Sequence, residues 1–208
     1  MPQAEVNGAH IYYKVQGEGI PLVLSHGGWT DTSHWLPNVE PLAKRWQVIV
    51  WDRRGCGRSS DPGDGHTWQT WRDDLRGLLD HLGIESAYVG GCSSYGALLS
   101  LELALEWPHL VRALVIESGS PDGITGSGPD LVPFPARAGE LHRIKVPALI
   151  VQGEFDPFWP PPVGERLQWG IQGSELLVVS GAAHVPHLDD PALFNRTVEE
   201  FLGRVEAD

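Results

Sequence analysis

The sequence predicts an α/β fold in which a doubly wound, mostly parallel sheet is flanked by helices. Several runs of about five residues are apolar throughout, as strands are when helices cover both faces of a sheet. Segments with apolar residues at three- and four-residue spacing lie between these runs. Strand and helix alternate in this way from residue 21 to the end of the sequence, which implies right-handed crossovers between parallel strands.

The predicted strands begin with a hairpin. Asn7-Gly8 separates two segments of alternating apolar residues, and this dipeptide favours a tight β-turn. The six runs predicted to form the parallel strands are residues 21–25, 47–51, 87–91, 114–117, 148–152 and 176–180.

Three segments have helical patterns. The apolar residues from Trp68 to Leu82 follow a Pro- and Gly-rich loop, and those from Leu193 to Leu202 follow Asp190-Pro191, which is a helix start signal. The third segment is the apolar run of residues 97–105.

Length, charge and cysteine content exclude several classes of protein. The 208 residues suffice for a single domain, predicted over 1–208. The 15 basic and 27 acidic residues give a net charge of −12, which disfavours binding to nucleic acid or to an anionic membrane. Without a signal sequence or an apolar stretch of about 20 residues, a cytoplasmic enzyme with a small, neutral or apolar substrate is expected. Cys56 and Cys92 match no disulfide framework or zinc pattern, and no cofactor is expected.

A strand-to-helix junction carries the strongest candidate nucleophile. In Cys92-Ser93-Ser94-Tyr95-Gly96, small residues lie two positions before and two positions after Ser94, as a tight turn around an exposed nucleophile requires. Cys92 is the second candidate because it also has small neighbours. Ser93 ranks third, since it would place the bulky Tyr95 where a small residue is needed.

Five sequence blocks resemble those of the α/β-hydrolase superfamily of esterases, lactonases, dehalogenases and C–C hydrolases. The blocks are residues 25–29 (SHGGW), 51–59 (WDRRGCGRS), 92–96 (CSSYG), 153–156 (GEFD) and 181–191 (GAAHVPHLDDP). They follow the order found in the family and extend over nearly the whole chain. The resemblance implies an α/β-hydrolase fold and a Ser-His-acid triad that needs no metal.

The resemblance implies that Ser94 is the nucleophile, His184 the base and Asp156 the acid. Histidine suits the role of base because its unperturbed pKa lies near neutrality. Asp156 follows the strand predicted at 148–152, at the edge where ligands of parallel sheets bind. Glu117 and Asp122 remain alternative acids, because some members of the fold carry the acid after the preceding strand.

Backbone N–H groups and aromatic side chains complete the predicted site. The oxyanion hole is expected to use the N–H of Tyr95 and that of Gly28, with Trp29 as the alternative to Gly28. Trp29, Phe158 and Trp159 adjoin these loops and are predicted to line the substrate pocket.

A metal site near the C-terminus is an alternative that the sequence disfavours. His184, His187, Asp189 and Asp190 are potential ligands, but Pro186 breaks any helix that would align them.

Residues 118–145 are predicted to form an irregular, Gly- and Pro-rich segment in place of a lid. A shallow site would favour hydrolysis of accessible carboxylic esters, and a serine at position 94 disfavours the branches that use an aspartate nucleophile. A lactonase, a thioesterase or a non-catalytic binding protein are the alternatives. The protein is expected to be a monomer, or a homodimer if apolar surface around Trp29, Phe134 and Trp159 is exposed.

Overall fold

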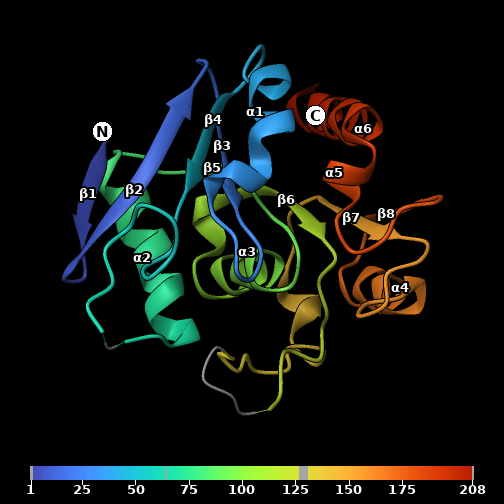
Figure 1. Cartoon of the computed structure of the whole chain (residues 1–208). Coiled ribbons are helices and arrows are strands. Elements are labelled where there is room, and N and C mark those ends of the chain that lie inside the picture. The colour runs from blue at the N-terminus through green and yellow to red at the C-terminus, as the bar shows by residue number, and fades with distance from the viewer. Residues whose placement is uncertain (1, 64, 127–130, 208) are drawn as a thin grey trace.

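The computed structural model describes residues 2–63, 65–126 and 131–207 and contains an eight-stranded sheet (Figure 1). The strands are β1 (Gln3–Val6), β2 (Ala9–Gln16), β3 (Pro21–Ser25), β4 (Gln47–Trp51), β5 (Ala87–Gly91), β6 (Val111–Glu117), β7 (Ala148–Gly153) and β8 (Glu175–Val179). Their order across the sheet is β1-β2-β4-β3-β5-β6-β7-β8. The pairs β1–β2 and β2–β4 are antiparallel, and the other neighbouring strands are parallel. The predicted fold class is therefore confirmed.

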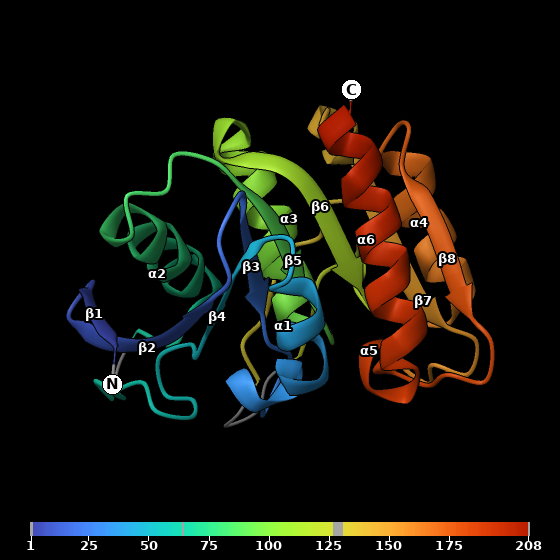
Figure 2. The same ribbon diagram turned by 90° about the horizontal axis from the view of Figure 1, so that it is seen from above.

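Helices cover both faces of the sheet (Figures 1 and 2). One face carries α1 (Leu36–Leu42) and α6 (Pro191–Ala207), and the other carries α2 (Trp68–His81), α3 (Tyr95–Glu106) and α4 (Pro161–Gly170). Each layer has its own core, and β5 and β7 are buried at every residue because both layers pack on them. The helices α1 and α4 were not predicted from the sequence, because both carry prolines at or near their first residues and α1 also has one in its interior.

The chain reverses its winding direction at β3. It passes from β3 to β4 on one side and then returns across β3 to form β5 on the other side. The arrowheads of β3, β6 and β8 point toward the same edge (Figure 2), so the loops that follow the parallel strands gather there. Ligand sites of doubly wound sheets form at this reversal point.

The connection between β6 and β7 is a reduced cap. Its described residues, 118–126 and 131–145, form turns, a bridge between Ile124 and Phe134, and a 3₁₀ helix at Leu141–Arg143, with no α-helix. The Gly- and Pro-rich stretch at 127–130 lies outside the described residues. Phe134 is not part of an exposed apolar surface as anticipated, because it is buried against the rings of Trp71 and Tyr95.

Among the described residues, no helix combines the length and the apolar character that crossing a membrane would require.

Candidate active site

Ser94 lies in a sterically tight turn between β5 and α3. Its φ and ψ angles are 64° and −85°, a conformation that non-glycine residues rarely adopt. A Cβ atom on Gly96 would lie 2.3 Å from the Ser25 carbonyl oxygen, and one on Gly91 would lie 2.0 Å from the Gly96 carbonyl oxygen. The turn therefore excludes a larger residue at Gly96, in agreement with the steric argument from sequence, and it also excludes one at Gly91.

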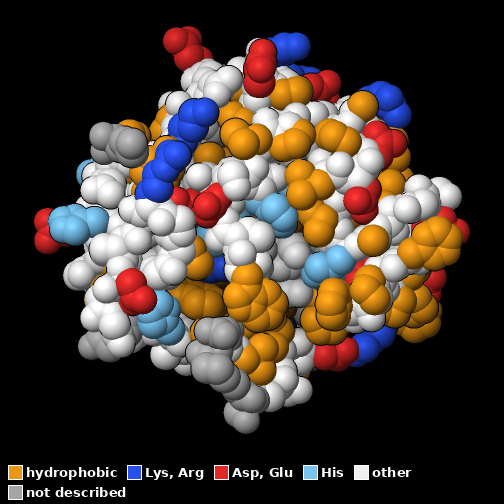
Figure 3. Space-filling model, viewed as in Figure 1, with side chains coloured by type: hydrophobic (Ala, Val, Ile, Leu, Met, Phe, Trp, Pro, Cys, Tyr) orange, Lys and Arg blue, Asp and Glu red, His pale blue; other side chains and the backbone are white. Residues whose placement is uncertain are grey.

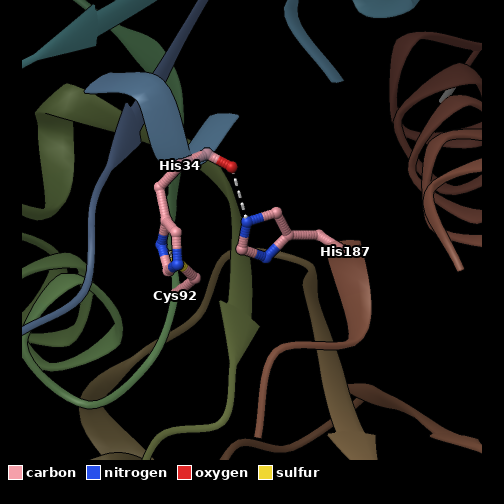
Figure 4. Close-up of side chains that lie close together, drawn as sticks. All are labelled: His34, Cys92 and His187. Atoms are coloured by element: carbon pink, nitrogen blue, oxygen red, sulfur yellow. Dashed lines mark hydrogen bonds between the residues drawn. The ribbon is translucent and has the colours of Figure 1, made fainter. Parts of the chain in front are cut away.

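Cys92 is unsuited to the role of nucleophile. The residue is fully buried, and burial raises the pKa of its thiol well above the ordinary value. Its sulfur lies 3.5 Å from Nδ1 of His34, and Figure 4 shows the two side chains next to each other. Cys92 does not line the cavity that Ser93, Ser94 and His184 share. The environment thus favours a serine over the cysteine.

His184 and Asp156 form a close pair. Nδ1 of His184 lies 2.9 Å from Oδ1 and 2.8 Å from Oδ2 of Asp156. Oδ1 also accepts hydrogen bonds from the backbone N–H groups of Phe158 and Trp159, and Oδ2 accepts one from the Gln152 side chain. Burial acts to raise the pKa of Asp156, but the hydrogen bonds from His184 and from these backbone groups outweigh it and hold the pKa below its ordinary value. Asp156 is therefore ionised near neutral pH.

The two alternative acids have other partners. The Glu117 carboxylate accepts hydrogen bonds from the backbone N–H of His187 at 2.7 Å and from its Nδ1 at 2.6 Å, and both side chains are fully buried. Asp122 forms an exposed ion pair with Arg166. The Glu117–His187 pair, 70 residues apart in sequence, was not anticipated; the sequence signal was only a carboxylate at the end of a buried strand.

The Ser94 hydroxyl accepts a hydrogen bond from the indole N–H of Trp159, at 2.8 Å. The hydroxyl is therefore engaged by Trp159 and not by His184, although both Ser94 and His184 line one cavity of about 360 Å³. Trp159 thus covers part of the nucleophile from the loop after β7, a role that the sequence did not indicate.

The three predicted pocket aromatics all line the same cavity as Ser94. Trp29 and Phe158 are 77% and 66% exposed, and the Phe158 ring contacts the His184 ring edge-on with 4.9 Å between centroids. Hydrophobic side chains gather beside histidine side chains near the centre of the face seen in Figure 3. Apolar groups of a ligand would find matching surface there.

The oxyanion-hole candidates differ in their hydrogen bonds. Tyr95 is the first residue of α3, so its N–H has no acceptor inside the helix. The Gly28 N–H donates to the Ser93 carbonyl at 3.3 Å, a long bond beside the nucleophile. Trp29 has a left-handed backbone conformation, with φ of 51°. Both loop candidates line the same cavity as Ser94, and the Gly28 N–H would exchange its long bond to the Ser93 carbonyl for one to an oxyanion.

The residues weighed as metal ligands have other roles. His184 pairs with Asp156, His187 pairs with Glu117, Asp189 accepts the Ala183 N–H, and Asp190 accepts the Leu193 N–H at the start of α6.

Within the described residues, a different group brings His34, Cys92 and His187 within 4.8 Å of one another. Nδ1 of His187 is engaged by Glu117 and its Nε2 lies 3.0 Å from the His34 carbonyl oxygen (Figure 4), so this imidazole offers no free nitrogen to a metal.

Comparisons with known proteins agree with this architecture. A relative named as a carbamate hydrolase, RutD of Azorhizobium caulinodans, is 29% identical over 266 aligned positions that include 99% of this chain and 100% of the relative. The alignment is longer than the 208 residues of this chain, so RutD has segments that this chain lacks. A hydrolase of Bacillus subtilis, YraK, is 35% identical over 113 residues, which are 53% of this chain and 41% of YraK.

A solved structure has the same fold, and a family profile matches the sequence. The enol-lactonase of Burkholderia xenovorans has a TM-score of 0.89 at 23% identity, with 97% of this chain and 100% of that chain covered. The profile of the family described as the alpha/beta hydrolase fold matches residues 20–131. With its parallel sheet, its serine turn and this match over more than half of its length, the chain belongs to the α/β-hydrolase family.

Proposed function

We propose that this protein is a carboxylic ester hydrolase that works through an acyl-enzyme, with Ser94 as nucleophile, His184 as base and Asp156 as acid. The observation that carries the proposal is the His184–Asp156 pair, with Nδ1 within 2.9 Å of the carboxylate, in which His184 lines the same cavity as a serine on a strained strand-to-helix turn. A nucleophile, a base and an orienting carboxylate in this arrangement can perform acyl transfer without a metal or a cofactor.

The proposed reaction starts with a rotation of the Ser94 hydroxyl from Trp159 toward Nε2 of His184. Nδ1–H of His184 donates a hydrogen bond to the Asp156 carboxylate, so the proton stays on Nδ1 and Nε2 is left free to accept the serine proton. Ser94 attacks the ester carbonyl, and the backbone N–H groups of Tyr95 and of Gly28 or Trp29 stabilise the oxyanion. His184 then protonates the departing alcohol, and water, activated by the same imidazole, releases the acid.

The surroundings of Ser94 favour esters with apolar or aryl groups. The cavity is lined by Trp29, Phe158 and Trp159, and the reduced cap leaves two of these rings largely exposed. We therefore infer broad acceptance of small aryl esters. Lactones and thioesters undergo the same chemistry and are the nearest alternatives, and RutD adds carbamates to the classes worth testing.

Two measurements test the proposal. A fluorophosphonate probe should label one residue, Ser94, and mass spectrometry of the labelled peptide separates this serine from Ser93 and Cys92. A panel of p-nitrophenyl esters, lactones, thioesters and aryl carbamates of graded size then ranks the substrate classes by kcat/KM. Absence of both labelling and turnover would favour a binding protein with a hydrolase fold over an enzyme.

A further inference from the structure

We propose that Arg53 is a positioning residue of the oxyanion hole: its guanidinium fixes the peptide between Gly27 and Gly28 and so directs the Gly28 N–H toward the nucleophile. The inference rests on the proposed function and adds to it a residue outside the triad.

Arg53 is bonded to the oxyanion loop at three points. Its Nη1 donates to the His26 carbonyl at 2.5 Å, and its Nη2 donates to the Gly27 carbonyl at 2.7 Å. Its backbone N–H donates to Nε2 of His26 at 3.1 Å. Burial, and then the charge of Arg53, lower the pKa of His26 well below the ordinary value, so the imidazole stays neutral and can accept this bond.

The guanidinium has no acidic partner in the described part of the chain. The residue is 1% exposed, its Nε has no hydrogen-bond partner, and the contact to the Cys56 sulfur is long, at 4.0 Å. Its charge is stacked instead over Trp71 and Tyr95, whose ring centroids lie 5.0 and 5.6 Å from Cζ. A buried guanidinium stays protonated, and burying one without a carboxylate is costly. The two loop carbonyls are thus the strongest hydrogen-bond acceptors that this charge has.

The Gly27 carbonyl and the Gly28 N–H belong to the same planar trans peptide, so they point in opposite directions. Arg53 holds the carbonyl end, which Nδ1 of His26 also approaches at 2.9 Å, while the N–H end faces Ser93 at 3.3 Å. A hydrogen bond to the carbonyl also makes the N–H of the same peptide a better donor.

The loop needs such a restraint because it is built from glycine. A Cβ atom on Gly27 would lie 2.4 Å from Cβ of Ser93, so only glycine allows the loop to approach the nucleophile turn this closely. Two successive glycines have little intrinsic preference for one peptide orientation. Without Arg53, the Gly27 carbonyl would keep, among the described residues, only its contacts with Nδ1 of His26 at 2.9 Å and with the Thr30 hydroxyl at 3.3 Å. Without the charged partner, the peptide can rotate more readily and take the Gly28 N–H away from the site.

The experiment compares Arg53→Met and Arg53→Lys with Arg54→Met, a matched change at a neighbouring buried arginine that pairs with Asp74 and not with the loop. Two readouts are measured: kcat and KM for p-nitrophenyl butyrate, and inhibition by an aryl trifluoromethyl ketone, whose serine adduct carries an oxyanion. The matched methyl ketone serves as the inhibitor that forms no such adduct readily. Thermal unfolding of each variant reports folding.

Loss of one oxyanion-hole donor lowers kcat by about 10²–10³-fold, and a donor that is present but points in the wrong direction should lower kcat by less. We expect Arg53→Met to lower kcat by about 10–100-fold with little change in KM. The affinity for the trifluoromethyl ketone should fall by a similar factor, and the affinity for the methyl ketone should not change. Arg53→Lys, which keeps the charge and one donor, should lie between Arg53→Met and the wild type. Arg54→Met should lower the unfolding temperature without this selective loss.

A folded Arg53→Met variant that keeps its kcat and its affinity for the trifluoromethyl ketone would overturn the inference. If Arg53→Met does not fold, the same comparison with Arg53→Lys decides, with a smaller expected loss. A wild-type protein that neither hydrolyses esters nor reacts with fluorophosphonate would instead overturn the proposed function itself, and with it the role of Arg53.

Discussion

Replacing Asp156 with Asn is expected to reverse the proton arrangement of His184. Oδ1 of Asp156 already accepts two backbone N–H groups, from Phe158 at 2.9 Å and Trp159 at 3.0 Å. The amide oxygen of an asparagine should keep these bonds, which places its NH₂ group where Oδ2 lies, 2.8 Å from Nδ1 of His184 and 3.2 Å from the Gln152 amide nitrogen. The NH₂ donor then faces Nδ1 at the shorter of its two contacts with residue 156, where a protonated Nδ1 would set one donor against another, so we expect the imidazole proton to move to Nε2.

The magnitude follows from the loss of the base. An imidazole protonated at Nε2 cannot accept the Ser94 proton, and the equivalent change in serine proteases lowers kcat about 10⁴-fold, or about 5.4 kcal/mol of transition-state stabilisation. We expect a kcat loss approaching this value for p-nitrophenyl butyrate. Nitrogen chemical shifts of His184 in labelled protein would report the change of tautomer directly.

Asp122→Asn is the matched control, because Asp122 is an exposed carboxylate whose ion-pair partner among the described residues is Arg166, away from His184. It should leave kcat unchanged. A folded Asp156→Asn variant with kcat within about tenfold of the wild type would refute the reasoning, since the expected loss is about 10⁴-fold. A kcat loss of that size without a change in the His184 tautomer would refute the hydrogen-bond explanation alone.

Three further outcomes are expected. Ser94→Ala should abolish hydrolysis and fluorophosphonate labelling while Cys92→Ala keeps both; the reverse pattern would move the nucleophile to the cysteine. Trp159→Phe should speed acylation of small esters by about 2–10-fold in a stopped-flow burst, because it removes a hydrogen bond worth about 0.5–1.5 kcal/mol that Ser94 must break; a decrease would mean that the indole stabilises the transition state. Burial, and then the charge of His187, lower the pKa of His34 from 6.5 to about 4. Between these two pH values His34 is therefore protonated in the unfolded chain but not in the folded one. The free energy of unfolding should therefore fall between pH 6.5 and 4, and His34→Gln should flatten this decrease in urea titrations; an unchanged slope would exclude His34 as its source.

The sequence alone predicted the architecture, and its family resemblance favoured Asp156 over Glu117 and Asp122 as the partner of His184. Short strands that are apolar on both sides admit few arrangements other than a covered parallel sheet, and β3, β4 and β5 begin and end at the predicted residues. The tight turn at Ser94 could be predicted because it depends on local sterics, which Gly96 satisfies by lacking a side chain. Asp156 was readable because residues that follow parallel strands converge at one edge of the sheet.

Tertiary packing decided the contacts between distant loops. The hydrogen bond from Trp159 to Ser94 joins residues 65 positions apart, and the Glu117–His187 pair joins residues 70 positions apart. Neither contact leaves a periodic pattern or a spacing rule in the sequence, because each depends on where two separate loops pack against each other. The clamp of Arg53 on the Gly27 carbonyl has the same origin, since only the pairing of β3 with β4 brings the loops after these strands together. Sequence therefore determined which chemical groups reach the edge of the sheet, and the folded structure determined which of them meet.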